Sequence, residues 1–183
     1  MFEKINPLII IKDHLNTLKD YKPSIYGYEK YNIYDILLFF IAPALITIPI
    51  LLYSDIILVR NNLDILLIVF SIFTPLMFNI LILLYNTLQK NYTANTSKLK
   101  IRLMKEIYYN VSYSIFISIV IIILLLVSSL FNNTAINNNI LIQIIYGSAS
   151  YFIINFFLTL FMVLKRIYSL LRKEFMNIDN ANI

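Results

Sequence analysis

The stretch LDILLIVFSIFTPLMFNILILLY, residues 63–85, decides the fold class of this chain. It is longer than the about 20 helical residues that cross a hydrocarbon core of about 30 Å. Its one charged residue is Asp64, at its beginning. The stretch therefore predicts a transmembrane helix.

Three further apolar stretches flank this one, at residues 36–53, 107–131 and 140–164. Hydrophobic residues make up 60% of the 183-residue chain and charged residues 14%, whereas soluble domains have about 45–50% and about 25%. Short polar turns follow the first and third stretches, and short turns place consecutive helices side by side. The sequence thus predicts an all-α membrane protein. Its transmembrane domain, residues 36–164, is expected to be a four-helix bundle of two antiparallel hairpins.

Basic residues are distributed unequally between the two sides of the predicted membrane. They are frequent before residue 36, in the connection between residues 85 and 107, and in the tail 165–183, whereas the other two turns hold only Arg60. Short loops rich in Lys and Arg stay in the cytoplasm. Both termini are therefore predicted to be cytoplasmic. The bias toward Ile, Asn, Lys and Tyr is typical of an A+T-rich bacterial genome, so the bacterial cytoplasmic (inner) membrane is expected for this multi-pass chain.

Residues 1–35 are predicted to form a cytoplasmic amphipathic helix and a Tyr-rich linker. Asn6 can cap a helix that has Pro7 at its first position. Apolar residues then recur at steps of three and four, from Leu8 to Leu18. Two interpretations stay open for this helix. It lies on the inner leaflet of the bilayer, or it packs against its own bundle or a neighbouring subunit.

The cytoplasmic ends of the third and fourth spans are expected to continue as basic helices. Such helices can contact a cytoplasmic protein partner or anionic lipid headgroups. The candidate contact residues are Lys98, Lys100, Arg102, Lys105, Lys165, Arg166, Arg172 and Lys173.

Polar side chains inside the predicted spans are the best candidates for an intramembrane site. Asn79, Asn110, Ser114 and Asn155 all fall toward the cytoplasmic half of their spans. Together they could line a hydrated vestibule or bind a polar headgroup. The alternative is hydrogen bonding between helices, worth on average about 0.6 kcal/mol per contact in membranes.

Three prolines interrupt the first predicted hairpin, at Pro43, Pro49 and Pro75. Proline has no backbone N–H and so leaves a carbonyl without its helical donor, which a neighbouring group in the membrane must replace. Each proline is a candidate kink or hinge.

No residues in the sequence form a pattern typical of an active site. The chain has no cysteine, and its single histidine, His14, is expected to be solvated or to pack. Glycine-rich phosphate loops, nucleophile–base pairs and paired intramembrane carboxylates are missing from the sequence. We therefore expect no enzymatic activity, no metal or cofactor, and no direct binding of nucleic acid.

The segment KLKIRLMKEIYYNVSYSIFIS, residues 98–118, has a basic amphipathic beginning followed by Asn and Ser within the span. In this layout the chain resembles the four-span membrane subunits of bacterial anti-phage defence systems such as Kiwa. The resemblance implies a non-enzymatic membrane effector, sensor or docking subunit.

Three functions follow as hypotheses. The first is a homo-oligomeric effector or sensor in the lipid bilayer that forms or gates a pore when a cytoplasmic partner signals. The second is a membrane anchor for a soluble protein, and the third is a small transporter or lipid-binding protein.

Overall fold

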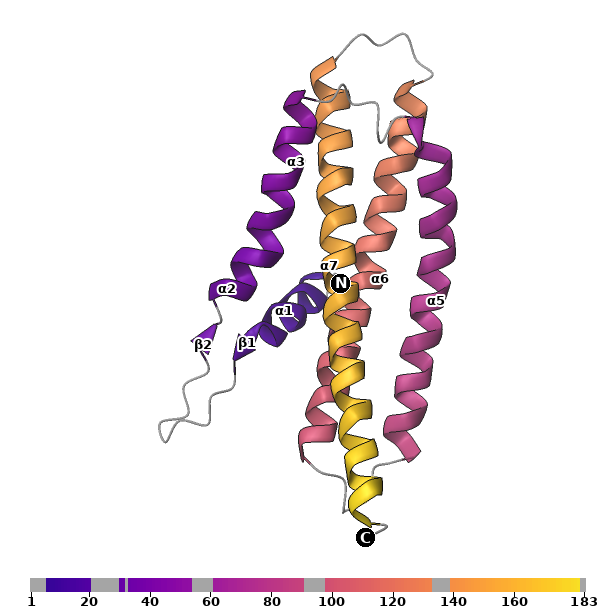
Figure 1. The fold of residues 1–183 in the computed structure, drawn as a ribbon. Helices are drawn as coiled ribbons and strands as arrows, with labels where there is room; N and C mark the ends of the chain where they lie inside the picture. The colour runs from indigo at the N-terminus through magenta and orange to yellow at the C-terminus, as the bar shows by residue number, and fades with distance from the viewer. Residues whose placement is uncertain are drawn as a thin grey trace.

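The computed structural model describes residues 6–20, 30–31, 33–53, 61–90, 98–132 and 139–181. Nearly all of them are helical (Figure 1). The elements are α1 (Leu8–Thr17), β1 (Lys19–Asp20), β2 (Lys30–Tyr31), α2 (Ile33–Ile36), η2 (Leu37–Ile41), α3 (Ala42–Tyr53), α5 (Leu63–Lys90), α6 (Lys98–Asn132) and α7 (Asn139–Ala181).

Among the described residues, three helices are long and apolar enough to cross a membrane, over Leu63–Gln89, Lys100–Leu130 and Ile140–Arg172. They are α5, α6 and α7, and they correspond to the second, third and fourth predicted spans. The third and fourth spans continue beyond the apolar stretches as helices, as the sequence predicts. The apolar helix in the region of the first predicted span is shorter, Leu37–Pro49.

Helix α6 lies at the centre of the bundle, in contact with α5, α7 and α1. Its residues Ile117, Ile121 and Leu125 are spaced four apart, so they share one face, and that face is fully buried. Phe70 of α5 and Phe156 of α7 meet edge to face beside this core, with ring centroids 5.1 Å apart. Apolar packing thus joins the three long helices.

The first predicted hairpin is wrong. Helix α3 packs against α7, and within the described residues it makes no comparable contact with α5, which lies on the other side of the bundle (Figure 1). The second predicted hairpin is confirmed, because α6 and α7 are antiparallel neighbours. The turn at residues 54–60 and the turn at residues 133–138 lie outside the described residues.

Helix α1 packs against α6 at a steep angle to the long helices (Figure 1). The predicted cap is confirmed, since the Asn6 Oδ1 accepts a hydrogen bond from the Leu8 N–H at 3.0 Å. Leu18 is 1% exposed and Leu8 is 66% exposed, so only the C-terminal part of the predicted stripe is buried. A short antiparallel ladder, with Lys19 opposite Tyr31, then ties the end of α1 to the start of α2. Of the two interpretations left open, the structure shows packing on the chain's own bundle.

Candidate polar junction between helices

Five of the buried polar residues gather where α1 and η2 meet α6 and α7. We call this cluster of His14, Thr17, Asn110, Tyr113 and Asn155 the polar junction. All five residues are buried, with exposed fractions of 7% or less. Buried polar groups need hydrogen-bond partners, so the way in which these five pair decides how the helices dock.

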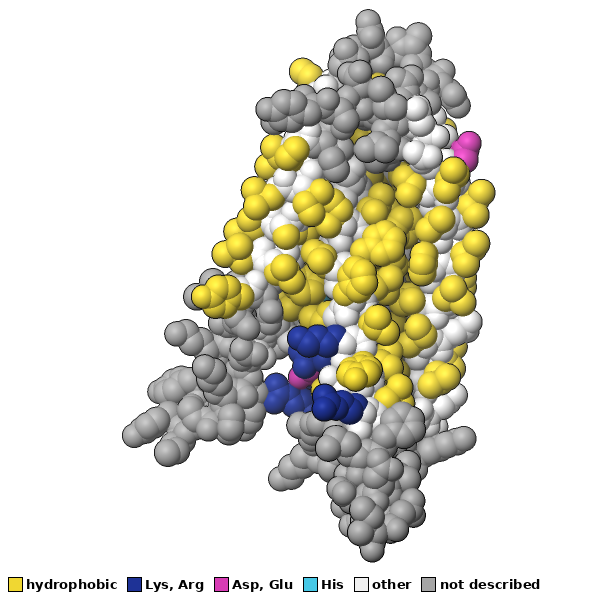
Figure 2. Space-filling view, in the orientation of Figure 1, with side chains coloured by type: hydrophobic (Ala, Val, Ile, Leu, Met, Phe, Trp, Pro, Cys, Tyr) yellow, Lys and Arg dark blue, Asp and Glu magenta, His cyan; other side chains and the backbone are white. Residues whose placement is uncertain are grey.

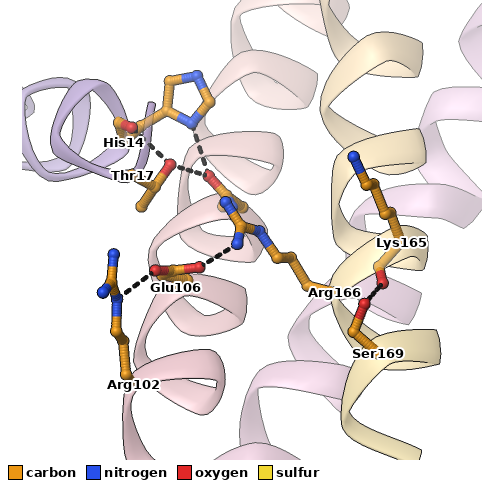
Figure 3. Close-up of polar contacts among 8 residues, drawn as sticks. His14, Thr17, Arg102, Glu106, Lys165, Arg166 and Ser169 are labelled. Carbon is orange, nitrogen blue, oxygen red and sulfur yellow. Dashed lines mark hydrogen bonds and ion pairs between the residues drawn. The ribbon is translucent and has the colours of Figure 1, made fainter. Parts of the chain in front are cut away.

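The side-chain oxygen of Asn110, on α6, accepts hydrogen bonds from two polar side chains of α1. Its Oδ1 lies 2.9 Å from the Thr17 hydroxyl and 2.8 Å from Nδ1 of His14, as the dashed lines in Figure 3 show. The contact with the imidazole requires the tautomer of His14 that carries its proton on Nδ1. His14 and Thr17 are three residues apart on α1, so they project from the same face. One face of α1 therefore docks on a single amide.

The ring of His14 is enclosed by aromatic side chains. It stacks on Tyr113 with ring centroids 3.7 Å apart and an interplanar angle of 7°, and it meets the edge of Phe39 at 5.7 Å. Burial lowers the pKa of His14 to about 4, and the hydrogen bond to Asn110 opposes part of this shift. His14 is therefore neutral near pH 7.

Asn155 of α7 holds the helix that contains Pro43. Because Pro43 has no N–H, the carbonyl of Phe39, four residues earlier, loses its α-helical donor. Asn155 replaces that donor, with Nδ2 at 2.9 Å from the Phe39 oxygen. The backbone there forms the π-helical turn η2, in which the Ala42 N–H reaches back to Leu37. The sequence-based expectation that a neighbour must satisfy the freed carbonyl is thus confirmed for Pro43.

Tyr113 links the two halves of the polar junction. Its ring stacks on the imidazole of His14, and its hydroxyl donates a hydrogen bond to Oδ1 of Asn155 at 3.3 Å. Side chains from α1, α6 and α7 and a backbone carbonyl of η2 thus form one continuous buried contact. The Asn110 Nδ2 atom is buried without a hydrogen-bond partner among the described residues. An orphaned donor of this kind makes the docked state less favourable than a fully paired one.

The four predicted intramembrane polar residues do not all meet. Asn110 and Asn155 belong to the polar junction, and the buried Ser114 donates to the backbone carbonyl of Asn110 at 2.9 Å. Asn79 lies instead on the exposed face of α5. Of the prolines, Pro43 is buried, whereas Pro49 and Pro75 are exposed. The structure therefore brings together the predicted residues of α6 and α7 and places Asn79 apart from them.

A charged cluster lies one helical turn beyond the polar junction. Glu106 of α6 is 8% exposed and accepts a hydrogen bond from Nε of Arg102 at 2.9 Å. Its second oxygen is 2.6 Å from Nη1 of Arg166 on α7, a contact that is an ion pair by distance rather than a directed hydrogen bond. Figure 3 shows Glu106 between the two arginines. The carboxylate thus joins α6 to α7.

The other predicted contact residues belong to the same two helices as this cluster. Lys105 and Lys165 are exposed, as is Arg172, and the ammonium of Lys105 lies 5.6 Å above the ring of Tyr109. In Figure 2 the basic side chains gather around an acidic one below a broad apolar surface. Lys100 is half-buried on the first turns of α6. The side chains of Lys98 and Lys173 lie outside the described part of the structure.

Sequence reasoning missed His14, Thr17 and Glu106 as contact residues. The spacing of Arg102 and Glu106, four apart on a helix, is a local signal for an ion pair. His14 and Thr17 share a face of α1, but they interrupt an apolar stripe, and no local pattern indicates that a distant asparagine receives them.

Comparison with known proteins gives no match, whether against protein-family models, curated proteins or solved structures.

Proposed function

We propose that this protein is a non-enzymatic membrane sensor or effector that works as a homo-oligomer, with α1 as its regulatory element. The observation that carries the proposal is the docking of α1 through two polar side chains, His14 and Thr17, onto one buried amide. An apolar contact alone would suffice for a permanent anchor. A polar contact of this kind can be exchanged for water when α1 leaves, so it suits a reversible contact.

The proposal places four spans in the bacterial inner membrane, with both termini in the cytoplasm. The first span would be the continuous helical run α2–η2–α3, residues 33–53, which is about 31 Å long at about 1.5 Å per residue. That length matches a hydrocarbon core of about 30 Å. Arg102, Lys105, Lys165 and Arg166 gather at the end assigned to the cytoplasm, and Asp64 lies at the start of α5.

The exposed residues of α1 form a surface that a cytoplasmic partner could bind. Leu8 and Ile9 are 66% and 57% exposed at the start of the helix, and Lys12 and Asn16 are exposed further along. A protein that binds α1 more tightly in the released state than in the docked state would draw His14 and Thr17 away from Asn110. The loss of α1 would expose the polar junction, and in an oligomer it would loosen the packing of α6 against its neighbours. A pore gated in this way would be one form of the membrane effector, sensor or docking subunit that the anti-phage resemblance implies.

The test compares two variants of α1 with the same new side chain. His14→Glu places a charge in the buried face, whereas Asn16→Glu changes an exposed position two residues away. In liposomes that contain the purified protein, we expect a trapped dye to leak with His14→Glu and to be retained with Asn16→Glu and the unchanged chain. If α1 is released in His14→Glu and the vesicles remain sealed to dye and ions, the pore is excluded.

The charged cluster favours a second candidate, a membrane anchor for a soluble protein. Arg102, Lys105, Lys165, Arg166 and Arg172 present a basic surface at one end of the bundle, with Glu106 paired to Arg102 and Arg166. An acidic soluble partner would bind this surface. Isolation of the chain in mild detergent should then recover that partner, and a triple exchange of Lys105, Lys165 and Arg172 to Glu should release it. Recovery of this chain alone would exclude the anchor.

A further inference from the structure

The outward face of α5 is the least covered part of the three long helices. Within the most apolar window of each candidate span, 11% is buried for α5, 33% for α7 and 50% for α6. Helix α5 uses one side to contact α6, where Phe70 and Met77 are buried. Its opposite side carries only exposed residues.

These exposed residues recur with a regular spacing of alternately three and four. Such a 3–4 repeat places side chains along one seam of a helix that pairs with another helix in a left-handed coil. We call it the α5 seam. Its members are Ile65, Ile68, Ile72, Pro75, Asn79, Ile82, Asn86 and Gln89.

Asn79 is the residue of the α5 seam whose amide cannot form hydrogen bonds with lipid tails. It is ten residues from Gln89, or about 15 Å along the helix from the nearer end of the candidate span. Within the described part of the chain its amide has no hydrogen-bond partner. Pro75 on the same seam also removes the N–H that would bond to the Ser71 carbonyl. Polar groups at this depth find partners on another helix.

The two buried asparagines of the long helices, Asn110 and Asn155, show what such amides do in this molecule. Asn110 receives α1, and Asn155 holds the η2 backbone. Each of them docks a different element on the long helices. By the same logic Asn79 marks a third docking surface, and the described residues contain nothing that covers it.

We propose that the α5 seam pairs with the α5 seam of a second copy, in parallel, so that Asn79 lies opposite Asn79. Copies in one membrane share their orientation, so two α5 helices related by a two-fold axis along the membrane normal run in the same direction. An amide has both a donor and an acceptor, and is therefore complementary to itself across that axis. The isoleucines at 65, 68, 72 and 82 are 55–61% exposed and supply the apolar part of the contact.

A single asparagine in such a repeat fixes register and the number of helices. The pairing rests on the membrane location and homo-oligomer given under the proposed function, and it names the surface that builds the oligomer. It does not depend on whether the oligomer forms a pore.

Cysteine cross-linking tests the pairing directly, because the natural chain has no cysteine. Ile72→Cys and Ile82→Cys place a thiol on the α5 seam, and Phe157→Cys places one on α7, where Phe157 is 41% exposed. After oxidation in native membranes, we expect disulfide-linked dimers for the two seam variants and monomers for Phe157→Cys. Cross-linking through Phe157 instead, or a seam thiol linked to another protein, would overturn the α5 pairing.

Asn79→Leu tests the role of the amide itself. Loss of one interhelical hydrogen bond should weaken dimerisation between about threefold and about thirtyfold. Asn86→Leu is the matched control, since Asn86 lies on the same seam near the end of the span, where water competes, and should change dimerisation less. Equal effects of the two variants, or tighter pairing in Asn79→Leu, would contradict the proposal. Disulfide cross-links through the α5 seam without dye leakage would support the pairing and exclude only the pore hypothesis.

Discussion

Asn110 and Asn79 are the same residue type in two neighbouring helices, yet the molecule uses them differently. Asn110 is fully buried and binds His14 and Thr17 of α1, whereas Asn79 faces outward from α5 without a partner in the described chain. The difference teaches that an asparagine in a span marks a place where something docks. It does not say whether that something is part of the same chain.

The first prediction compares these two residues by substitution with leucine. Asn110→Leu leaves the buried His14 and Thr17 side chains without a partner and should destabilise the docked monomer by about 2–4 kcal/mol. Asn79→Leu should leave the stability of the monomer unchanged within about 0.5 kcal/mol, because it removes no intramolecular contact. Thermal unfolding in detergent, under conditions where the protein is monomeric, measures both. A larger loss of monomer stability in Asn79→Leu than in Asn110→Leu would contradict the assignment of the two residues.

The second prediction concerns the pH dependence of the docking of α1 on Asn110. The pKa of His14 is about 4 when α1 is docked and close to 6.5 when it is released. Between these values the released state binds more protons, so docking is strongest above pH 6.5 and is lost as the pH falls toward 4. The docking equilibrium should weaken by up to about tenfold per pH unit in that window.

Proteolytic release of α1 at pH 7 and pH 5 measures this effect, with two controls. His14→Gln should abolish the pH dependence, because glutamine has no proton to gain. Glu106→Gln should preserve it, although Glu106 is the nearest buried acid on α6. A pH dependence that persists in His14→Gln would assign it to another group.

The third prediction concerns Asn155 and the carbonyl that Pro43 frees. Asn155→Leu removes the Nδ2 donor from the Phe39 oxygen and should cost about 1–2 kcal/mol. Pro43→Ala restores an N–H that can bond to the same oxygen. In the Pro43→Ala background, Asn155→Leu should therefore cost no more than about half as much. A double-mutant cycle on thermal unfolding measures the coupling, and strict additivity would contradict the assignment.

The fourth and smallest prediction concerns the charged cluster. Arg166→Gln removes one of the two partners of Glu106, but the Arg166 side chain is 31% exposed and Arg102 remains bound. We expect a loss of about 1 kcal/mol or less, reduced further by salt. Thermal unfolding at low and high salt measures it. A loss above about 3 kcal/mol would mean that the pair behaves as a buried one.

The sequence predicts the long helices well and their partners poorly. The spans that became α5, α6 and α7 could be found because continuous apolar runs and their polar ends are local features. The need to satisfy the carbonyl freed by Pro43 could also be predicted, because it follows from the chemistry of one residue. The residue that satisfies it, Asn155, lies more than a hundred positions away and carries no local sign of that role.

The contact of α3 with α7 and the outward position of Asn79 escaped prediction for the same reason. Turn length suggests that consecutive helices pair, but long-range polar contacts at η2 and α1 decide which helices adjoin α6 and α7. His14 was expected to be solvated or to pack, and it packs, although its partner Asn110 is 96 residues away.

The docking of α1 by Asn110 is the central contact of the proposed function, and the reactivity of one thiol measures that docking directly. Leu18 is 1% exposed against the bundle, so Leu18→Cys should react slowly with a maleimide in native membranes, whereas Asn16→Cys on the exposed face should react fast. With Asn110→Leu added, we predict that labelling of residue 18 accelerates by at least about thirtyfold, as a loss of about 2–4 kcal/mol implies. Equal labelling rates with Asn110 and with leucine in its place would contradict the account.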